Sequence, residues 1–185
     1  VLTTRELGRM IKEVGIDMLN LEEEKHDRLM GTSTGAADIF GSTSGVMEAA
    51  LRTAYEEITG EELPELDLTQ VRGMEGIKDA KIEIGDMTLR VGVTHGLGNA
   101  RKMMEMIDNG AEYHFVEFMA CPGGCIGGGG QPVPTNEEVV EKRMEAIYEI
   151  DANKKMRKSH ENPEIQKLYE EFLGEPNSHK AHKLL

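Results

Sequence analysis

A glycine-rich loop that holds both cysteines constrains the fold of this chain more than any other stretch. Residues 118–132 read FMACPGGCIGGGGQP and contain Cys121, Cys125 and six of the chain's 21 glycines. Glycine and proline at this density end helices and strands, so the stretch is predicted to be an irregular loop. The run AEYHFVEFMA, residues 111–120, leads directly into the cysteines and has the aromatic and β-branched composition of a strand. The two thiols are therefore predicted to follow the end of a strand.

The segments before this loop predict an α/β fold. Residues 81–96 are predicted to form a hairpin that turns at Gly85 and Asp86, and residues 98–110 to form a helix. A strand, a helix and a second strand in this order place the two strands parallel. We expect a small, mostly parallel sheet with flanking helices. The cysteine loop then lies at the carboxyl end of a parallel strand, where open α/β sheets place their chemistry.

Two helices are predicted before the sheet. Thr3 and Glu6 form a capping-box pattern at the first, and the second covers residues 46–60, ending at Gly60. A polar connection, residues 20–38, lies between them. The second helix has one apolar stripe that is predicted to face the core: Met47, Leu51, Ala54 and Ile58.

Two more helices are predicted after the loop, over residues 136–156 and 162–176, the second capped by Asn162. Their predicted apolar faces consist of Val140, Met144, Ile147 and Tyr148 in the first helix, and Ile165, Leu168, Tyr169, Phe172 and Leu173 in the second. We predict that residues 1–135 form one α/β lobe and that residues 136–185 form a helical tail.

Composition excludes several classes of protein. The chain has 185 residues and a net charge of -13, which argues against nucleic-acid binding because a basic face is missing. No apolar run approaches the roughly 20 residues of a membrane helix. Two cysteines do not make a secreted disulfide scaffold, so a reducing compartment such as the cytoplasm is expected. The first residue is Val1 and the last helical pattern has no breaker, so we expect a segment of a longer protein. A missing N-terminus leaves a periplasmic location open.

The cysteine pair has several possible interpretations. A local disulfide, inert thiols, a zinc site and an iron–sulfur cluster all remain open from the residues alone, and the spacing differs from the Cys-X-X-Cys of redox enzymes. Glycines let backbone N–H groups approach a bulky inorganic cluster, which favours the last interpretation. A cubane needs four protein ligands, so two would have to come from outside this chain.

Two other glycine turns precede helices. Gly41 and Gly45 flank a turn that suits either anion binding or close helix packing, and close packing is the more frequent reason for such a turn. Gly96 and Gly98 resemble the start of a dinucleotide fingerprint, but the third glycine is absent, so we predict a tight strand-to-helix turn. The six histidines are scattered and receive no role.

The cysteine loop resembles the third signature of the iron-only ([FeFe]) hydrogenases, Phe/Val-Met-Ala-Cys-X-Gly-Gly-Cys-X-X-Gly-Gly-Gly-Gln-Pro. The resemblance extends along the chain in the family's order, through VLTTRELGRMIK, IFGSTSGVMEAALRTAYE, VRGMEGIKDA, YHFVEFMAC and the later RKSHEN. The last stretch belongs to a helical region that is a separate small subunit in some periplasmic members of the family.

The resemblance implies a role for each thiol. Cys121 would ligate the [4Fe-4S] cubane of the H-cluster. Cys125 would ligate the same cubane and bridge to a di-iron subsite that carries carbon monoxide, cyanide and a dithiolate. The resemblance implies a pocket around this subsite formed by Met119, Phe40, Gly41, Gly45 and Gly124.

Two family signatures, Thr-Ser-Cys-Cys-Pro and Met-Pro-Cys-X-X-Lys, are absent from this chain. They would carry the other two cubane ligands and the proton-relay cysteine, so no catalytic acid or base is expected here. Ser44 stands where the family usually has glycine, and we expect it to crowd the subsite or hydrogen-bond to it.

The implied activity is reversible oxidation of dihydrogen and reduction of protons. The implied partners are the missing N-terminal part of the same protein and an electron carrier such as ferredoxin, or NAD(H) through partner subunits, with no nucleic acid and no membrane. The chain alone is expected to be inactive. Two alternatives remain: a non-catalytic relative of iron–sulfur assembly, like the prelamin A recognition factor-like proteins, and a zinc-binding or redox-sensing domain.

Overall fold

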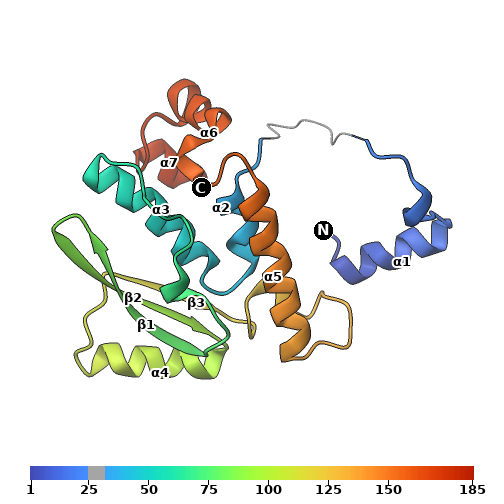
Figure 1. Cartoon of the computed structure of the whole chain (residues 1–185), viewed down its shortest axis with the longest axis horizontal. Helices are drawn as coiled ribbons and strands as arrows, with labels where there is room; N and C mark the ends of the chain where they lie inside the picture. Colours follow the sequence, from blue (N-terminus) through green and yellow to red (C-terminus); the bar gives the residue numbers. More distant parts are fainter. Residues whose placement is uncertain (25–31) are drawn as a thin grey trace.

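The computed structural model describes residues 1–24 and 32–185, so part of the predicted polar connection, residues 25–31, lies outside the described residues. The described part is an α/β fold with a small sheet and flanking helices (Figure 1), and the predicted class is confirmed. Its longer elements are α1 (Thr4–Val14), α2 (Gly35–Asp38), α3 (Gly45–Thr59), β1 (Ile77–Ile84), β2 (Met87–His95), α4 (Leu97–Asp108), β3 (Phe115–Met119), α5 (Glu137–Asn153), α6 (Pro163–Leu168) and α7 (His179–Leu184). Short helical turns are η1 (Met18–Asn20), η2 (Ile39–Gly41), η3 (Thr69–Val71), η4 (Cys125–Gly127), η5 (Ser159–Glu161) and η6 (Tyr169–Leu173).

The sheet has the strand order β1-β2-β3 and contains one antiparallel and one parallel pairing. Strands β1 and β2 form the predicted hairpin around Gly85 and Asp86, with Ile84 opposite Met87. Strand β3 pairs parallel to β2 after the crossover through α4, in a register that places His95 opposite Met119. The predicted parallel crossover is therefore confirmed, and the carboxyl ends of β2 and β3 lie side by side.

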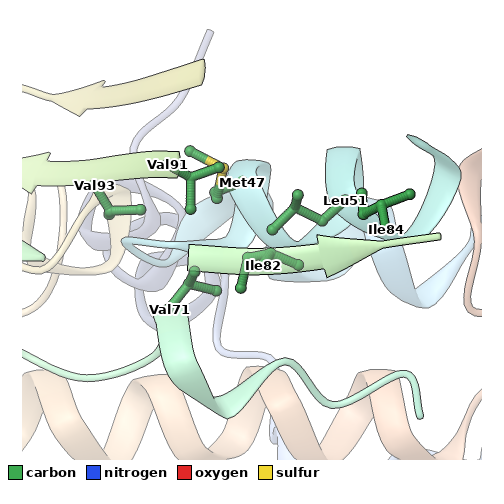
Figure 2. Packing of buried hydrophobic residues seen from close by; sticks show 7 residues of the cluster. All are labelled: Met47, Leu51, Val71, Ile82, Ile84, Val91 and Val93. Carbon is green, nitrogen blue, oxygen red and sulfur yellow. The ribbon is translucent and has the colours of Figure 1, made fainter. Parts of the chain in front are cut away.

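The main core lies between one face of the sheet and α3. Met47 and Leu51 of α3 pack on Ile82, Ile84, Val91 and Val93, and Val71 of η3 closes one side (Figure 2). Residues that alternate along a strand point to opposite faces. Gly92 accordingly faces α4, where a Cβ would lie 3.0 Å from Met103 Cε. Helices α3 and α4 thus cover opposite faces of the sheet.

The apolar stripe predicted for α3 is correct for three of its four residues. Met47 and Leu51 are buried and Ala54 packs against the core, but Ile58 is exposed. Ile58 lies in the last turn of α3, beside the Gly85–Asp86 turn, where the sheet no longer covers the helix. The predicted end of the helix is confirmed, since Gly60 caps it with φ +70°.

Helix α5 packs into the lobe formed by the preceding residues. Its Val140 and Met144 form a buried cluster with Ile126 from the cysteine loop. Ile147 and Tyr148 pack against that cluster and against the buried Ala36, Ile39 and Ala49. The helix begins at Glu137 because Asn136 accepts a hydrogen bond from Val139 N–H at 3.0 Å. The apolar face predicted for this helix is confirmed.

The last predicted helix is shorter than expected and buries less. Asn162 caps α6 and Pro163 is its first residue, as predicted, but the chain continues as a wide π turn over Tyr169–Leu173. Of the predicted apolar stripe only Leu173 is buried, whereas Ile165 is exposed and Phe172 is 53% exposed. The Lys180 ammonium lies 3.5 Å from the centroid of the Phe172 ring. The stripe is therefore not a core face in the part of the chain that the structure describes.

A network of buried charges joins the end of α5 to α3. Arg52 has no exposed side-chain surface and contacts Asp151 at 2.7 Å, and Asp151 also binds Arg157 at 2.6 Å. Such a network must hydrogen-bond every charge to offset the loss of hydration. It is completed by three more side chains: Glu48, Asp67 and Arg72.

Helix α1 has the predicted capping box at Thr3 and Glu6. Across the described residues of this segment none is buried, and Leu7, Met10 and Val14 are exposed. Figure 1 shows the helix to one side of the sheet and its covering helices. A single hydrogen bond from Arg5 N–H to the Gly130 carbonyl, at 3.1 Å, joins its first turn to the cysteine loop. Among the described residues, no helix is long and apolar enough to cross a membrane.

Candidate metal centre

The cysteine loop leaves the carboxyl end of β3, as predicted, and folds into consecutive tight turns. Strand β3 ends at Met119, and the turn η4 begins at Cys125. Gly124 N–H donates to the Cys121 carbonyl, and Gly128 N–H donates to the Cys125 carbonyl, both at 3.0 Å. These bonds within the loop fix the backbone at both cysteines and need no bound ligand.

Both cysteines are free thiols. Cys121 is half-buried and Cys125 is exposed, so the structure has neither a local disulfide nor two thiols enclosed in the core. Across residues 1–24 and 32–185, no group of three or more His, Cys, Asp or Glu side chains could hold a metal ion. A tetrahedral zinc and an iron–sulfur cubane each need four ligands. Any metal centre on this loop therefore needs ligands from beyond the described residues.

Two glycines permit close backbone packing at this loop, Gly124 against the turn that precedes α3 and Gly127 within the loop itself. Gly124 has φ +97°, and a Cβ there would lie 2.7 Å from Thr43 N and 2.8 Å from Gly41 O. A Cβ at Gly127 would lie 2.0 Å from the Pro122 carbonyl oxygen. The glycines therefore serve close backbone packing, and this packing brings Gly124 against Gly41, two of the residues predicted for the pocket.

The other predicted pocket residues have different surroundings. Phe40 is 47% exposed and Met119 is half-buried, so both side chains have surface available to a ligand. Gly45 is fully buried against the chain itself, because a Cβ there would lie 1.7 Å from the Ile39 carbonyl oxygen. Close packing thus accounts for Gly45, and a Gly45→Leu variant would report on the fold of the turn and not on a subsite.

Ser44 does not have the surroundings that we expected. Its hydroxyl donates to the Val71 carbonyl in the interior, and the side chain is fully buried, so the expectation that it contacts the subsite is wrong. Its backbone has φ +76°, in the left-handed region that favours glycine. This conformation is the physical reason why glycine suits the position. The hydrogen bond to Val71 helps to hold serine there.

Glu117, in the middle of β3, binds the start of α3. Its carboxylate accepts backbone N–H groups from Ser44 at 2.7 Å and from Met47 at 2.8 Å, and the side chain is 5% exposed. Burial raises the pKa of Glu117, while these N–H donors and the Lys78 ammonium oppose the rise. Burial also lowers the pKa of Lys78 to about 8, although the charge of Glu117 favours its protonated form. Sequence analysis missed Glu117. The signal that could have indicated its role was a carboxylate inside a predicted strand, between the apolar Val116 and Phe118.

His95, the last residue of β2, binds the cysteine loop directly. Its Nδ1 lies 3.1 Å from Gly123 N, its Nε2 lies 3.1 Å from the Met74 carbonyl oxygen, and its side chain is almost fully buried. The next residue, Gly96, donates its N–H to the Met119 carbonyl at 2.8 Å and forms the predicted tight turn into α4. Sequence analysis assigned no role to His95. Its place at the end of a strand, directly before Gly96, was the one usable signal.

The fold and this loop define an α/β domain that presents two free thiols at the carboxyl edge of its sheet, held by backbone packing and by His95. Comparison with known proteins defines the class further. Residues 1–129 match the family described as "Iron only hydrogenase large subunit, C-terminal domain", and residues 137–185 match "Iron hydrogenase small subunit". The chain belongs to the iron-only hydrogenase family.

Individual relatives agree with this assignment. The NADP-reducing hydrogenase subunit HndD of Solidesulfovibrio fructosivorans is 54% identical over 100% of this chain and 32% of its own length. A solved structure of the [FeFe]-hydrogenase HydA1 from Chlamydomonas reinhardtii has a TM-score of 0.74 at 45% identity, over 97% of this chain and 52% of that chain. Protein NAR1 of Arabidopsis thaliana is more distant, 31% identical over 100% of this chain and 40% of its length. The chain thus spans about a third to a half of the relatives it matches.

Proposed function

We propose that this chain is the carboxyl-terminal part of a hydrogenase that catalyses the reversible oxidation of dihydrogen. The observation that supports this most directly is the pair of free thiols, Cys121 and Cys125, on a loop at the carboxyl end of β3 in a member of this family. The activity belongs to the full-length protein, because the chain spans 32% of its hydrogenase relative.

Cys121 and Cys125 would supply two of the four cysteine ligands of the H-cluster cubane, and Cys125 would also connect the cubane to the di-iron subsite. The donor set fits this group, since both thiols are free and Cys125 is exposed. When bound, the cluster supplies a position for dihydrogen and the redox capacity for its electrons. The other two ligands come from the upstream part of the protein.

The remaining residues of this site shape the surroundings of the thiols. Phe40 and Met119 present apolar surface that would exclude water from a cluster on this loop. Gly124 lets the turn before α3, which contains Gly41, approach the loop to backbone contact distance. No residue of this chain is assigned the transfer of protons, which belongs to an upstream cysteine.

The division into a lobe of residues 1–135 and a tail of residues 136–185 remains part of this proposal. The family match that ends at residue 129 and the one that begins at residue 137 lie close to the proposed boundary. The tail nevertheless shares buried clusters and the charge network with the lobe, so the two parts act as one folded unit. Electron transfer to ferredoxin, or to NAD(H) through partner subunits, and a cytoplasmic location are also proposed.

A second candidate function is a role in iron–sulfur assembly without hydrogen chemistry. The 29% identity over the whole chain to the Cytosolic iron-sulfur assembly component 3 of Mus musculus favours keeping this candidate. The higher identity of 54% to a hydrogenase subunit favours hydrogen turnover. A zinc-binding or redox-sensing domain is the third candidate, because two free thiols could equally supply two of the four ligands of a zinc ion.

Infrared spectroscopy and hydrogen turnover of the full-length protein, produced anaerobically with its cofactors, distinguish these functions. We expect carbon monoxide and cyanide stretching bands together with hydrogen evolution from a reduced dye. Iron and sulfide without those bands and without turnover would identify an assembly relative, and zinc without sulfide would identify a zinc domain. Either result contradicts the proposed activity.

A further inference from the structure

We infer that His95 is a positioning residue for the cysteine loop: its imidazole fixes the peptide of Gly123, which lies between the two thiols. The inference deepens the proposed function and rests on cluster ligation by Cys121 and Cys125. His95 lies in β2, outside the cysteine motif, and we assign to it control over the position of the two thiols.

The fold places His95 next to the loop through the parallel register. His95 pairs with Met119 at the carboxyl ends of β2 and β3, and Gly96 N–H holds the Met119 carbonyl at 2.8 Å. The imidazole therefore starts from the strand beside β3 and reaches the loop two residues after Cys121, where Gly123 N lies 3.1 Å from Nδ1.

The two partners of the imidazole fix its tautomer. A backbone N–H can only donate, so Nδ1, which accepts from Gly123, carries no proton. A carbonyl oxygen can only accept, so Nε2, 3.1 Å from Met74 O, carries the proton. Both ring nitrogens are therefore occupied. Because the residue is 6% exposed, water cannot easily replace either partner.

Gly123 is held from its other side as well. Its carbonyl accepts the Thr43 N–H at 2.9 Å, so both the N–H and the carbonyl of Gly123 have a hydrogen-bond partner. Its φ is +78°, and a Cβ would lie 2.4 Å from Val140 Cγ1. The backbone between the thiols is thus fixed by His95, by the turn before α3 and by α5. Of these three contacts, only the one from His95 comes through a side-chain hydrogen bond.

If His95 only stabilised the fold, the important contact would be the one from Nε2 to Met74 and not the one from Nδ1 to Gly123. Nε2 joins β2 to the segment before β1 through Met74, and His95 N–H already donates to Gly76 O at 3.2 Å in the same segment. The two roles can be separated by amide side chains. The oxygen of Asn lies close to the position of His Nδ1, and the amide of Gln lies close to the position of Nε2. His95→Asn therefore keeps an acceptor for Gly123, whereas His95→Gln keeps a donor for Met74.

The test uses the full-length protein, loaded anaerobically with its iron–sulfur cubane. The loss of iron to a chelator, the EPR spectrum and the midpoint potential of the reduced cubane are measured for wild type and both variants. We expect His95→Gln to lose iron about 10-fold or more faster, with a shifted EPR spectrum and potential, because hydrogen bonds that orient metal ligands change metal affinity by about this factor. His95→Asn should stay within about threefold of wild type. His114→Gln is a matched control, because His114 Nδ1 also accepts a backbone N–H, from Arg90 at 3.0 Å, at the other end of β3.

Thermal unfolding of the cluster-free proteins separates positioning from stability. Similar midpoints for the two His95 variants, with different iron loss, support the inference. Equal iron loss in both variants, or wild-type behaviour of His95→Gln, overturns it while the proposed function stands. If His95→Gln does not fold, rapid iron loss in His95→Asn overturns the inference and wild-type retention supports it. A wild-type protein that binds no cubane overturns the proposed function itself.

Discussion

Glu117 of β3 accepts the backbone N–H of Ser44 at 2.7 Å, directly before α3 begins. The contact joins two segments that are far apart in the sequence. Glu117 lies on the strand that leads into the cysteines, and Ser44 lies in the turn that Gly124 contacts. The buried carboxylate therefore sets the distance between the turn before α3 and the strand that positions the thiols.

Replacing Glu117 with Gln is expected to destabilise the chain by about 1–3 kcal/mol, the cost of leaving one buried N–H without an acceptor. The amide retains one acceptor oxygen, so only one of the N–H groups of Ser44 and Met47 keeps its partner. Urea denaturation of the cluster-free protein measures the loss. Glu57→Gln, on the exposed side of α3, is the control and should change stability by less than about 0.5 kcal/mol. Equal effects of the two variants would show that Glu117 does not anchor α3.

At Ser44, substitution by glycine is expected to reduce stability less than substitution by alanine. Ser44→Ala keeps the left-handed backbone strain and leaves the Val71 carbonyl without its donor, so we expect a loss of about 1–2 kcal/mol. Ser44→Gly loses the same bond but relieves the strain, so its stability should lie within about 1 kcal/mol of wild type. Thermal unfolding of the two variants measures the order. A glycine variant less stable than the alanine variant would contradict the importance of φ at this position.

The charge network predicts a large cost for removing one partner. Asp151→Asn leaves Arg52 and Arg157 with an uncompensated charge in the interior, and we expect a loss of about 3–5 kcal/mol. The matched control is Asp79→Asn, which breaks the half-exposed pair with Arg90 and should cost no more than about 1 kcal/mol. Limited proteolysis of the Asp151 variant should cut first near the end of α5. Comparable losses in the two variants would mean that the network does not hold the tail.

Acid sensitivity should arise in part from Glu56. Burial alone would raise the pKa of Glu56, but hydrogen bonds from the Lys158 ammonium, the Leu63 N–H and His160 lower it to about 2. A carboxylate with a lowered folded-state pKa contributes stability that is complete above the unfolded value of 4.5 and is lost as the pH falls toward 2. The stability difference between wild type and Glu56→Gln should therefore shrink by up to about 3 kcal/mol over that window. Urea denaturation at several pH values tests this, and a difference that is constant with pH would contradict it.

Local sequence signals were sufficient for the elements that carry the site. The hairpin at Gly85, the crossover to β3 and the loop after Met119 follow from strand and helix periods and from glycine turns, which act over a few residues. Those signals could not predict the hydrogen bonds between residues far apart in the sequence that hold the site together. The bond from Gly123 to His95 spans 28 residues and that from Ser44 to Glu117 spans 73, so no local pattern encodes either.

The same limit explains two of the corrected interpretations. The apolar stripe predicted for residues 162–176 has helical spacing, but a stripe indicates only that a face is apolar and not that a partner covers it within the described chain. Ser44 was placed near the subsite by its position in a motif. Its left-handed backbone, which directs the hydroxyl to Val71, has no signature in a single sequence.

Iron bound per protein after anaerobic reconstitution tests cluster ligation by the two thiols most directly. For the full-length protein with only its cubane sites loaded, each of Cys121→Ser and Cys125→Ser should lower the iron content by about four atoms, one cubane, relative to wild type. Met87→Leu, at the opposite end of β2 from the loop, should leave the iron content unchanged. Wild-type iron content in both serine variants would contradict ligation by these thiols, and the proposed hydrogenase site would fail with it.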